Sequence, residues 1–265
     1  MRIVRTVAEV RGALDGPRRR GERIGLVPTM GAFHAGHLAL MRGARAESDL
    51  VVVSLFVNPT QFTTADDLAR YPRDEASDAR AAEAEGADLL FVPAVEELYP
   101  TGFDSFVDPG ALASVLEGAA RPGHFRAVAT VCTKLFGIVQ PHAAWFGQKD
   151  AQQLAVIRRV VADLNLPLDV SAVSTVRDED GLALSSRNVF LSPDQRVAAL
   201  ALPRAIEAGA TAHRSGDDAA HAARRVLDAE PQLAVDYLEV ADLDGPTLVA
   251  AVCLGTTRLI DNARL

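Results

Sequence analysis

The stretch from residue 24 to residue 41 constrains the fold more than any other part of the sequence. It opens with the apolar run Ile24-Gly25-Leu26-Val27, continues as Pro28-Thr29-Met30-Gly31, and leads through Ala32-Phe33-His34-Ala35-Gly36-His37 into Leu38-Ala39-Leu40-Met41. This order predicts a strand at about residues 24–30, a tight glycine turn and a helix at about residues 36–46. Such a helix directs its unpaired N–H groups and the positive end of its dipole at the turn, where phosphate is the usual occupant.

Two histidines and a glycine mark the start of this predicted helix. His34 and His37 are three residues apart and would share one face, so both imidazoles could donate to charge developing on one phosphate. Gly36 has no Cβ and would let a flat ring or a ribose lie against the backbone. Two alternatives stay open here: half of a zinc site, and a pair of partly exposed helix residues. A zinc site would need more ligands, and neither cysteine lies near another candidate ligand.

Composition narrows the classes of protein to consider. Hydrophobic residues make up 49% of the 265 residues, which predicts a packed core. The formal net charge of −8 argues against binding nucleic acid through the overall field, so local groups must hold any anionic ligand. The N-terminus lacks the apolar core of a signal peptide, and no apolar run reaches membrane-spanning length. We therefore expect a cytoplasmic protein in which Cys132 and Cys253 are buried and reduced.

The hydrophobic pattern predicts a parallel sheet. Residues 50–57 form a second run that is apolar on both faces, and with the first strand and helix they predict a βαβ unit in a covered parallel sheet. Further strands are expected at residues 89–93, 143–146 and 168–173. The fold class is therefore α/β: a Rossmann-like parallel sheet with helices on both faces.

The composition shifts after about residue 176, and a smaller C-terminal α+β domain is expected there. Its predicted elements are a long helix at about 193–214, a second helix at about 217–229, and two strands at 235–240 and 248–260, the latter with interruptions. We place the two domains at residues 1–176 and 177–265.

Polar residues follow several predicted strands, where ligands bind in open α/β sheets. Gln61 lies beyond the strand at 50–57, although it could instead satisfy loop backbone. Lys149 precedes a helix expected at 151–164. A lysine is unfavourable near a helix N-terminus, so its place there suggests a bound anion, with an exposed loop lysine as the alternative.

Two other polar segments could bind anions or metal. Residues 63–85 carry acidic side chains that could hold Mg²⁺, although a solvated acidic face is the favoured interpretation. These are Asp66, Asp67, Asp74 and Asp78. Farther along, Ser185, Ser186 and Arg187 offer hydroxyl and guanidinium donors suited to polyphosphate on a mobile loop.

Taken in order, the motifs of this chain closely resemble those of the pantothenate synthetase family, within the His-x-Gly-His nucleotidylyl-transferase superfamily. The matching blocks are Pro28-Thr29-Met30-Gly31 with His34-x-Gly-His37, Phe56-Val57-Asn58-Pro59-Thr60-Gln61-Phe62, Tyr71-Pro72-Arg73, Arg121-Pro122-Gly123-His124-Phe125, Phe146-Gly147-Gln148-Lys149-Asp150-Ala151-Gln152-Gln153 and Leu184-Ser185-Ser186-Arg187-Asn188. The resemblance runs in register from about residue 24 to Asp261-Asn262.

The resemblance implies ATP-dependent condensation of D-pantoate with β-alanine through an enzyme-bound pantoyl adenylate, giving pantothenate, AMP and pyrophosphate. It implies Mg²⁺ with the ATP, without naming the metal ligands, and a homodimer. Nucleic acid and membrane are not expected as partners.

Site residues follow from the same motifs. His37 would be a proton donor, Lys149 would lie near the phosphates and Asp150 near the ribose. Gln61 would bridge pantoate and β-alanine, and Gln153 would bind pantoate. The implied ATP-binding residues are Met30, Gly31, His34, Gly36, His37, Gly147, Lys149, Asp150, Val176, Leu184, Ser185, Ser186 and Arg187. The implied catalytic residues are His34, His37, Lys149, Ser185, Ser186 and Arg187.

Three alternatives to a ligase are weighed against these residues. A nucleotidyltransferase that releases its adenylated product is disfavoured by the Gln61 and Gln153 blocks, and a nucleic-acid-linked synthetase by the acidic charge. A non-catalytic nucleotide-binding module is disfavoured because His37, Lys149 and Arg187 are all present.

Overall fold

The computed structural model describes residues 1–62 and 64–265, and it divides the chain into two compact units. The first unit comprises Met1–Phe146 and Gln152–Val173, and the second comprises Gly147–Ala151 and Ser174–Leu265. The predicted acidic segment 63–85 begins at Thr63, which lies outside the described residues.

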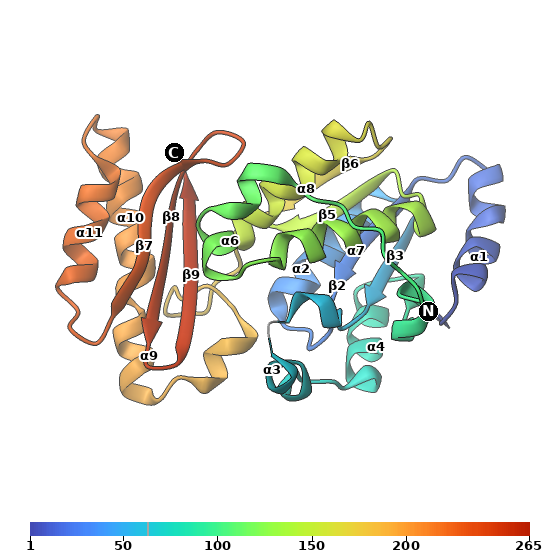
Figure 1. Ribbon diagram of the computed structural model, residues 1–265, viewed down its shortest axis with the longest axis horizontal. Coiled ribbons are helices and arrows are strands. Elements are labelled where there is room, and N and C mark those ends of the chain that lie inside the picture. Colours follow the sequence, from blue (N-terminus) through green and yellow to red (C-terminus); the bar gives the residue numbers. More distant parts are fainter. Residues whose placement is uncertain (63) are drawn as a thin grey trace. The chain divides into compact units, whose positions relative to one another are not determined.

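A six-stranded sheet forms the centre of the first unit (Figure 1). Its strand order is β1-β4-β3-β2-β5-β6, and the strands are parallel in each described pairing. The strands are β1 (Arg2–Val4), β2 (Ile24–Thr29), β3 (Leu50–Leu55), β4 (Leu89–Phe91), β5 (Ala143–Gly147) and β6 (Asp169–Val173). The predicted parallel α/β sheet is confirmed.

Helices cover both faces of this sheet because successive residues of its central strands point to opposite sides. Leu26 of β2 packs in one cluster with residues of α1 (Val7–Arg19) and α7 (His124–Val139). The next residue, Val27, packs in a second cluster with residues of α2 (Ala35–Glu47) and α4 (Glu75–Ala84). The other helices that the structure describes before Val173 are α3 (Ala65–Arg70), α5 (Val95–Leu98), α6 (Glu117–Ala120) and α8 (Ala151–Asp163).

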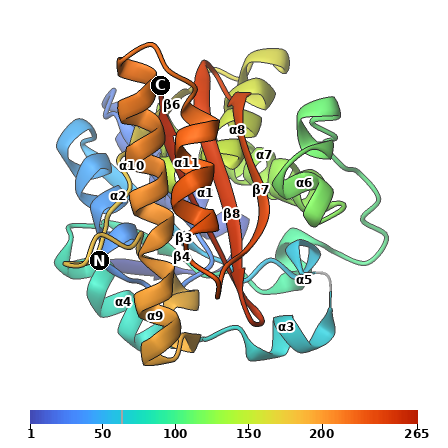
Figure 2. The same cartoon turned by 90° about the vertical axis from the view of Figure 1, so that its left-hand side faces the viewer.

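The second unit packs helices on a small antiparallel sheet (Figure 2). The helices are α9 (Pro193–Ala199), α10 (Ala201–Arg214) and α11 (Ala219–Asp228), and the strands, in the order β7-β8-β9, are β7 (Ala234–Asp242), β8 (Pro246–Leu254) and β9 (Thr257–Arg264). Leu202 of α10, Leu227 of α11 and Val252 of β8 lie in its buried core. The predicted smaller α+β unit is therefore present.

Two predicted elements of this unit are wrong in detail. The helix expected at 193–214 is divided near Leu200, where Pro203 has no N–H to donate to the carbonyl of Ala199. The strand expected at 248–260 is a hairpin of two strands, joined by Gly255 and Thr256, with Gly255 at φ +57°. Glycine at the first position of a two-residue turn is a hairpin signal, and the prediction did not use it.

The two cysteines differ in burial, although both are free thiols. Cys132 is buried in α7, and burial raises the pKa of its thiol to about 12. Cys253 is only half-buried, contrary to prediction, although its neighbour Leu254 at the end of β8 is 1% exposed.

Candidate active site

The turn between β2 and α2 is anchored by a buried carboxylate. Asp78 of α4 accepts hydrogen bonds from the backbone N–H groups of Ala32 at 2.9 Å and Phe33 at 2.8 Å, and it is only 4% exposed. Gly31 has φ +88°, and a Cβ there would lie 2.5 Å from Cδ1 of Leu55 and 2.8 Å from Oδ2 of Asp78. Only glycine therefore fits this conformation and this space.

The position of Asp78 corrects the sequence-based interpretation of the acidic segment. Asp66, Asp67 and Asp74 are exposed as predicted, and Asp74 caps α4 by accepting from the N–H of Ser77 at 2.9 Å. Asp78 is instead buried on α4, where it anchors the turn between β2 and α2. The local sequence carries little signal for this role, because α4 is rich in alanine and the partners of Asp78 are about 45 residues away in the chain.

The two histidines lie together at the start of α2. Their ring centroids are 4.2 Å apart, and His34 is the N-cap residue of the helix. Nδ1 of His34 accepts from the N–H of Gly36 at 3.1 Å, and Nδ1 of His37 accepts from the N–H of His34 at 3.4 Å. An accepting Nδ1 carries no proton, so a neutral ring keeps its proton on Nε2, where it can be donated.

The space beside Gly36, where a ligand ring or a ribose was expected, is occupied by a side chain of the protein. A Cβ at this position would lie 2.8 Å from Cε1 of His34, so the ring next to the backbone is the His34 imidazole. Met30, which precedes the turn, is half-buried. Glycine at position 36 thus allows His34 to cap the helix with its side chain.

Gln61 follows β3 in a single 3₁₀ turn (Pro59–Gln61) and is 9% exposed. Its Oε1 accepts from Nδ2 of Asn58 at 3.0 Å, so its Nε2 remains as the donating end of the amide. Arg121 donates to the backbone oxygen of Gln61 at 3.2 Å. The side chain of Gln61 bonds to the side chain of Asn58 and not to loop backbone. This disfavours the alternative interpretation, in which Gln61 satisfies loop backbone. Asn58 and Arg121 are neighbours of the candidate site that the sequence analysis did not assign.

The segments that carry His34, His37 and Gln61 leave the same edge of the sheet. Strands β2 and β3 pair in parallel, and the N–H of Phe56 donates to the carbonyl of Thr29 at 3.1 Å. Both polar segments therefore begin at the carboxyl ends of adjacent strands, which is where ligands bind in this fold class.

Gln153 lies half-buried on α8, beside a glutamine with a different environment. Gln152 is 5% exposed; its Oε1 accepts from the N–H of Glu117 at 3.0 Å and its Nε2 donates to the carbonyls of Leu112 and Val115, both at 2.8 Å. Gln152 thus anchors the segment before α7, while Gln153 is the partly accessible member of the pair.

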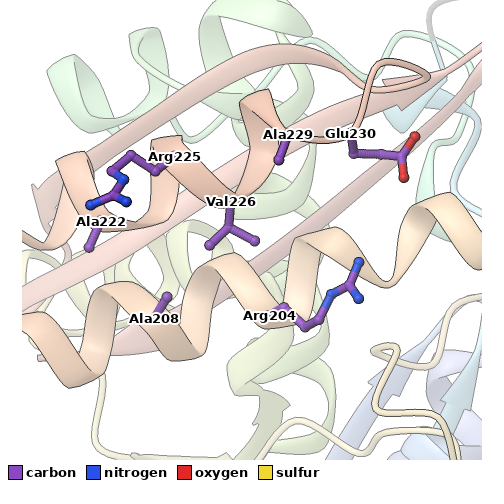
Figure 3. Close-up of a pocket in the computed structure, with 7 residues that line it drawn as sticks. All are labelled: Arg204, Ala208, Ala222, Arg225, Val226, Ala229 and Glu230. Carbon is purple, nitrogen blue, oxygen red and sulfur yellow. The ribbon is translucent and has the colours of Figure 1, made fainter.

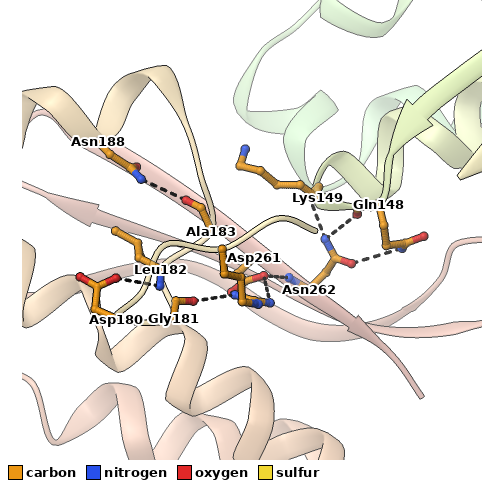
Figure 4. A network of polar contacts seen from close by, with 10 residues as sticks. Gln148, Lys149, Asp180, Gly181, Leu182, Ala183, Asn188, Asp261 and Asn262 are labelled. Atoms are coloured by element: carbon orange, nitrogen blue, oxygen red, sulfur yellow. Dashed lines mark hydrogen bonds and ion pairs between the residues drawn. The ribbon is translucent and has the colours of Figure 1, made fainter. Parts of the chain in front are cut away.

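In the second unit, Lys149 and Asp150 lie in a 3₁₀ turn (Gln148–Asp150) that precedes α8. Nζ of Lys149 is 3.8 Å from Oδ1 of Asp150, and the two side chains are 19% and 48% exposed. Asn262 of β9 donates to the carbonyls of both Gln148 and Lys149 (Figure 4). The turn is therefore held from the C-terminal strand.

The second polar segment of this unit is a tight loop from residue 176 to residue 190. The N–H of Leu184 donates to the carbonyl of Val176 at 2.9 Å, which brings together two predicted ATP-binding positions. Ser185 caps a 3₁₀ turn (Ser186–Phe190) by accepting from the N–H of Arg187 at 3.2 Å. Ser185 and Ser186 are half-buried and Arg187 is exposed.

Ion pairs hold the base of this loop. Arg177 donates to Asp261 at 2.6 and 3.0 Å, and the hydrogen bonds with Asp261 raise the pKa of Arg177 although burial opposes the shift. Arg196 of α9 is bonded to both Asp178 and Asp180.

The second unit also contains a groove of about 600 Å³ between α10 and α11 (Figure 3). It is lined by Arg204, Ala208, Ala222, Arg225, Val226, Ala229 and Glu230. None of these is a predicted site residue, so the groove is not part of the candidate active site.

Over residues 1–62 and 64–265, no three or more His, Cys, Asp or Glu side chains are grouped to hold a metal ion. In the same described part of the chain, no helix has the length and apolar character needed to cross a membrane.

The fold makes this chain an α/β protein whose predicted site residues follow the ends of parallel strands. The family described as Pantoate-beta-alanine ligase matches residues 2–264. A pantothenate synthetase of Roseiflexus sp. (strain RS-1) is 52% identical over 282 residues, covering 100% of this chain and 99% of its own. One of Moorella thermoacetica is 49% identical over 279 residues, with the same coverage.

Solved structures of pantothenate synthetases also match this chain. A pantothenate synthetase from Thermus thermophilus has a TM-score of 0.92 at 48% identity, covering 100% of this chain and 99% of that one. A pantoate-beta-alanine ligase from Francisella tularensis, complexed with beta-gamma ATP and beta-alanine, has a TM-score of 0.84 at 30% identity, covering 100% and 97%. The chain belongs to the pantoate–β-alanine ligase family, the pantothenate synthetases, whose known reaction is ATP-dependent ligation of pantoate and β-alanine. Among the functional interpretations of the sequence, the ligase is confirmed.

Proposed function

We propose that this ligase works in two steps, with an enzyme-bound pantoyl adenylate between them and with AMP and pyrophosphate as the released products. In the first step the pantoate carboxylate attacks the α-phosphate of ATP. In the second the amine of β-alanine attacks the resulting mixed anhydride. The observation that carries the proposal is the turn of residues 30–37, where two adjacent imidazoles lie at a helix N-terminus and the buried Asp78 accepts from the backbone N–H groups of Ala32 and Phe33.

The first step brings two negatively charged groups together, so the proposed catalytic residues are donors to the charge that builds on phosphate. In the first unit these are His34 and His37, and Met30, Gly31 and Gly36 would shape the nucleotide-binding turn. In the second unit they are Lys149, Ser185, Ser186 and Arg187, and Gly147, Asp150, Val176 and Leu184 would complete the nucleotide contacts. The pantoate carboxylate is already ionised, so this step needs no general base.

The two glutamines are the proposed substrate ligands. Asn58 fixes the orientation of the Gln61 amide, which supports its assignment to pantoate and β-alanine. The half-buried Gln153 would bind pantoate. Mg²⁺ would accompany ATP.

Larger features are proposed on the resemblance and the composition. Residues 1–176 would form the Rossmann-like nucleotide- and pantoate-binding domain, and residues 177–265 the C-terminal lid domain. The enzyme would be a cytoplasmic homodimer, without nucleic acid or membrane as a partner.

The test is isotope exchange. If a pantoyl adenylate forms first, labelled pyrophosphate should enter ATP in the presence of Mg²⁺ and pantoate, without β-alanine. Replacing His37 with Ala should slow this exchange by at least about 100-fold, as expected for loss of one transition-state donor. Exchange that strictly requires β-alanine would reject the two-step mechanism, and near-normal exchange in the variant would reject only the role of His37.

Residues 182–188 are the proposed lid that protects the anhydride from water until the amine arrives. Changing Ser186 and Arg187 together to Ala should slow exchange and raise the fraction of ATP consumed without pantothenate formed. Unchanged coupling of ATP use to product would reject the lid and leave the two-step mechanism in place.

A further inference from the structure

The C-terminal half of β9 holds two buried polar side chains. Asp261 is 2% exposed and Asn262 is 7% exposed. Each contacts a different one of the two segments that carry the predicted ATP-binding residues of this unit (Figure 4). We propose that Asp261 and Asn262 are positioning residues for the ATP-dependent step, a role that rests on the proposed function of those segments.

Asn262 fixes the turn that carries Lys149. Its Nδ2 donates to two successive carbonyls, those of Gln148 at 3.0 Å and Lys149 at 2.8 Å. Its Oδ1 accepts from Nε2 of Gln148 at 3.3 Å. An amide is the side chain that can supply two donors and an acceptor together, so all three contacts depend on asparagine at this position.

Asp261 fixes the loop that leads to Ser185. Its two oxygens accept from the guanidinium of Arg177 at 2.6 and 3.0 Å, and its Oδ1 also accepts from the N–H of Asn262 at 2.8 Å. The side chain of Arg177 in addition donates to the carbonyl of Gly181 at 3.1 Å. The buried carboxylate of Asp261 thus fixes Arg177, which pairs with Ala183 in an antiparallel bridge just before Leu184.

Consecutive residues of a strand point to opposite sides, so one strand end can reach two segments that are distant in the sequence. Buried polar groups that are fully hydrogen-bonded favour one arrangement over the alternatives. The pair therefore fixes where Lys149 and the 184–187 segment begin, although neither side chain would touch ATP. A purely structural role would instead lower stability and leave the use of ATP unchanged.

Asn262→Asp separates these roles, because it keeps the shape of the side chain and replaces both amide donors with a carboxylate facing two carbonyls. We expect kcat/KM for ATP in the exchange reaction to fall by about tenfold to a hundredfold, as for a small misplacement of a catalytic group. The KM for pantoate should change less than about twofold, since the proposed pantoate ligands lie in the first unit. Asn262→Ser, which adds no buried charge, should act in the same direction.

Leu227→Ala is the matched control for stability. Leu227 is fully buried in α11 in the core of the same unit, and its truncation should lower the unfolding midpoint in urea without changing the KM for ATP. If the Asn262 variants behave like this control, change both substrates equally, or fail to fold while Leu227→Ala folds, the positioning role is wrong.

A double-mutant cycle distinguishes this inference from the proposed function. If Asn262 acts through the turn of Lys149, the double variant of Asn262→Asp and Lys149→Ala should be scarcely slower than Lys149→Ala alone. Normal exchange in Lys149→Ala would reject the proposed site itself. Slow exchange in Lys149→Ala with additive losses in the double variant would reject only the positioning role of Asn262.

Discussion

Two segments carry predicted phosphate-binding residues, namely residues 30–37 and the loop of residues 176–190 with Leu184 to Arg187, and they are held in different ways. In the first, a buried carboxylate accepts from two successive N–H groups, and Gly31 has no room for a Cβ. In the second, ion pairs of Arg177 and Arg196 lie at the base and a 3₁₀ turn is capped by Ser185, but Val189 and Phe190 are 79% and 69% exposed.

This difference suggests that the two segments have different roles in the reaction. Donors that are preorganised for developing charge stabilise a transition state without a reorganisation cost, which suits the turn at residues 30–37. Beyond the buried Leu182 and Ala183, the second segment has few buried apolar side chains and would open easily, which suits the proposed lid. Under the proposed mechanism, the first segment would be a fixed template and the second a movable cover, which we call the movable segment.

Removing the anchor of the fixed segment should have the largest effect. Asp78→Ala leaves two amides of the turn without their acceptor, at a cost of about 1–3 kcal/mol each, so we expect the free energy of unfolding to fall by about 2–6 kcal/mol. Urea denaturation measures this change. Asp74→Ala on the same helix is the control; it removes an exposed N-cap and should cost about 1 kcal/mol. Equal losses in the two variants would show that Asp78 does not anchor the turn.

A pair of glycines tests the comparison next. Gly31 and Gly181 have nearly the same φ, +88° and +91°, but a Cβ at Gly181 would meet nothing within 4 Å. Both alanine variants carry the cost of left-handed backbone, and only Gly31→Ala adds overpacking. We therefore expect Gly31→Ala to be less stable than Gly181→Ala by about 1–3 kcal/mol in urea denaturation. Equal stability of the two variants would mean that the turn at Gly31 accommodates a Cβ as readily as the loop at Gly181 does.

The fold was largely predictable because its signals are local. Runs that are apolar on both faces, such as residues 24–27 and 50–57, indicate a covered parallel sheet by themselves. The glycine turn and the two histidines were also predictable because their signals are local in the sequence. The third strand of the small sheet was missed although Gly255-Thr256-Thr257-Arg258 breaks the apolar run, because the prediction treated this turn as an interruption within one strand.

The residues that hold the candidate site were not predictable in the same way. Asp78, Asp261 and Asn262 act through partners 45 to 114 residues away in the chain. Nothing in the composition around a polar residue says whether a distant backbone will approach it. Such positions become visible only when the fold brings their partners together.

The ion pairs of Arg196 test how the base of the movable segment is held. Arg196 and its partners Asp178 and Asp180 are each about a third exposed or more, so Arg196→Gln should lower the free energy of unfolding by only about 1 kcal/mol or less at neutral pH. Arg224→Gln, which removes an exposed i,i+4 pair with Asp228, is the control and should cost about 0.3–0.5 kcal/mol.

The effect of Arg196→Gln should also depend on pH. Burial alone would raise the pKa of Asp180, but hydrogen bonds from Arg196 and the Leu182 N–H outweigh it and hold the pKa below the ordinary value of 3.8. A lowered pKa in the folded state contributes stability above pH 3.8 that is lost as the pH falls through the folded pKa. The difference between wild type and Arg196→Gln should therefore shrink below pH 3.8. A stability difference that stays constant with pH would mean that the pair of Arg196 and Asp180 does not hold the base of the loop.

The exposed face of the movable segment should show the smallest effect. Phe190 is 69% exposed, so its ring loses little contact with water on folding and little is gained or lost when it is shortened. We expect Phe190→Ser to change the free energy of unfolding by less than about 0.5 kcal/mol, the usual range for surface substitutions. Urea denaturation at several protein concentrations measures it. A loss above about 1 kcal/mol that grows with dilution would show that the ring packs against a second copy of the chain, and the segment would then be a fixed contact and not a movable cover.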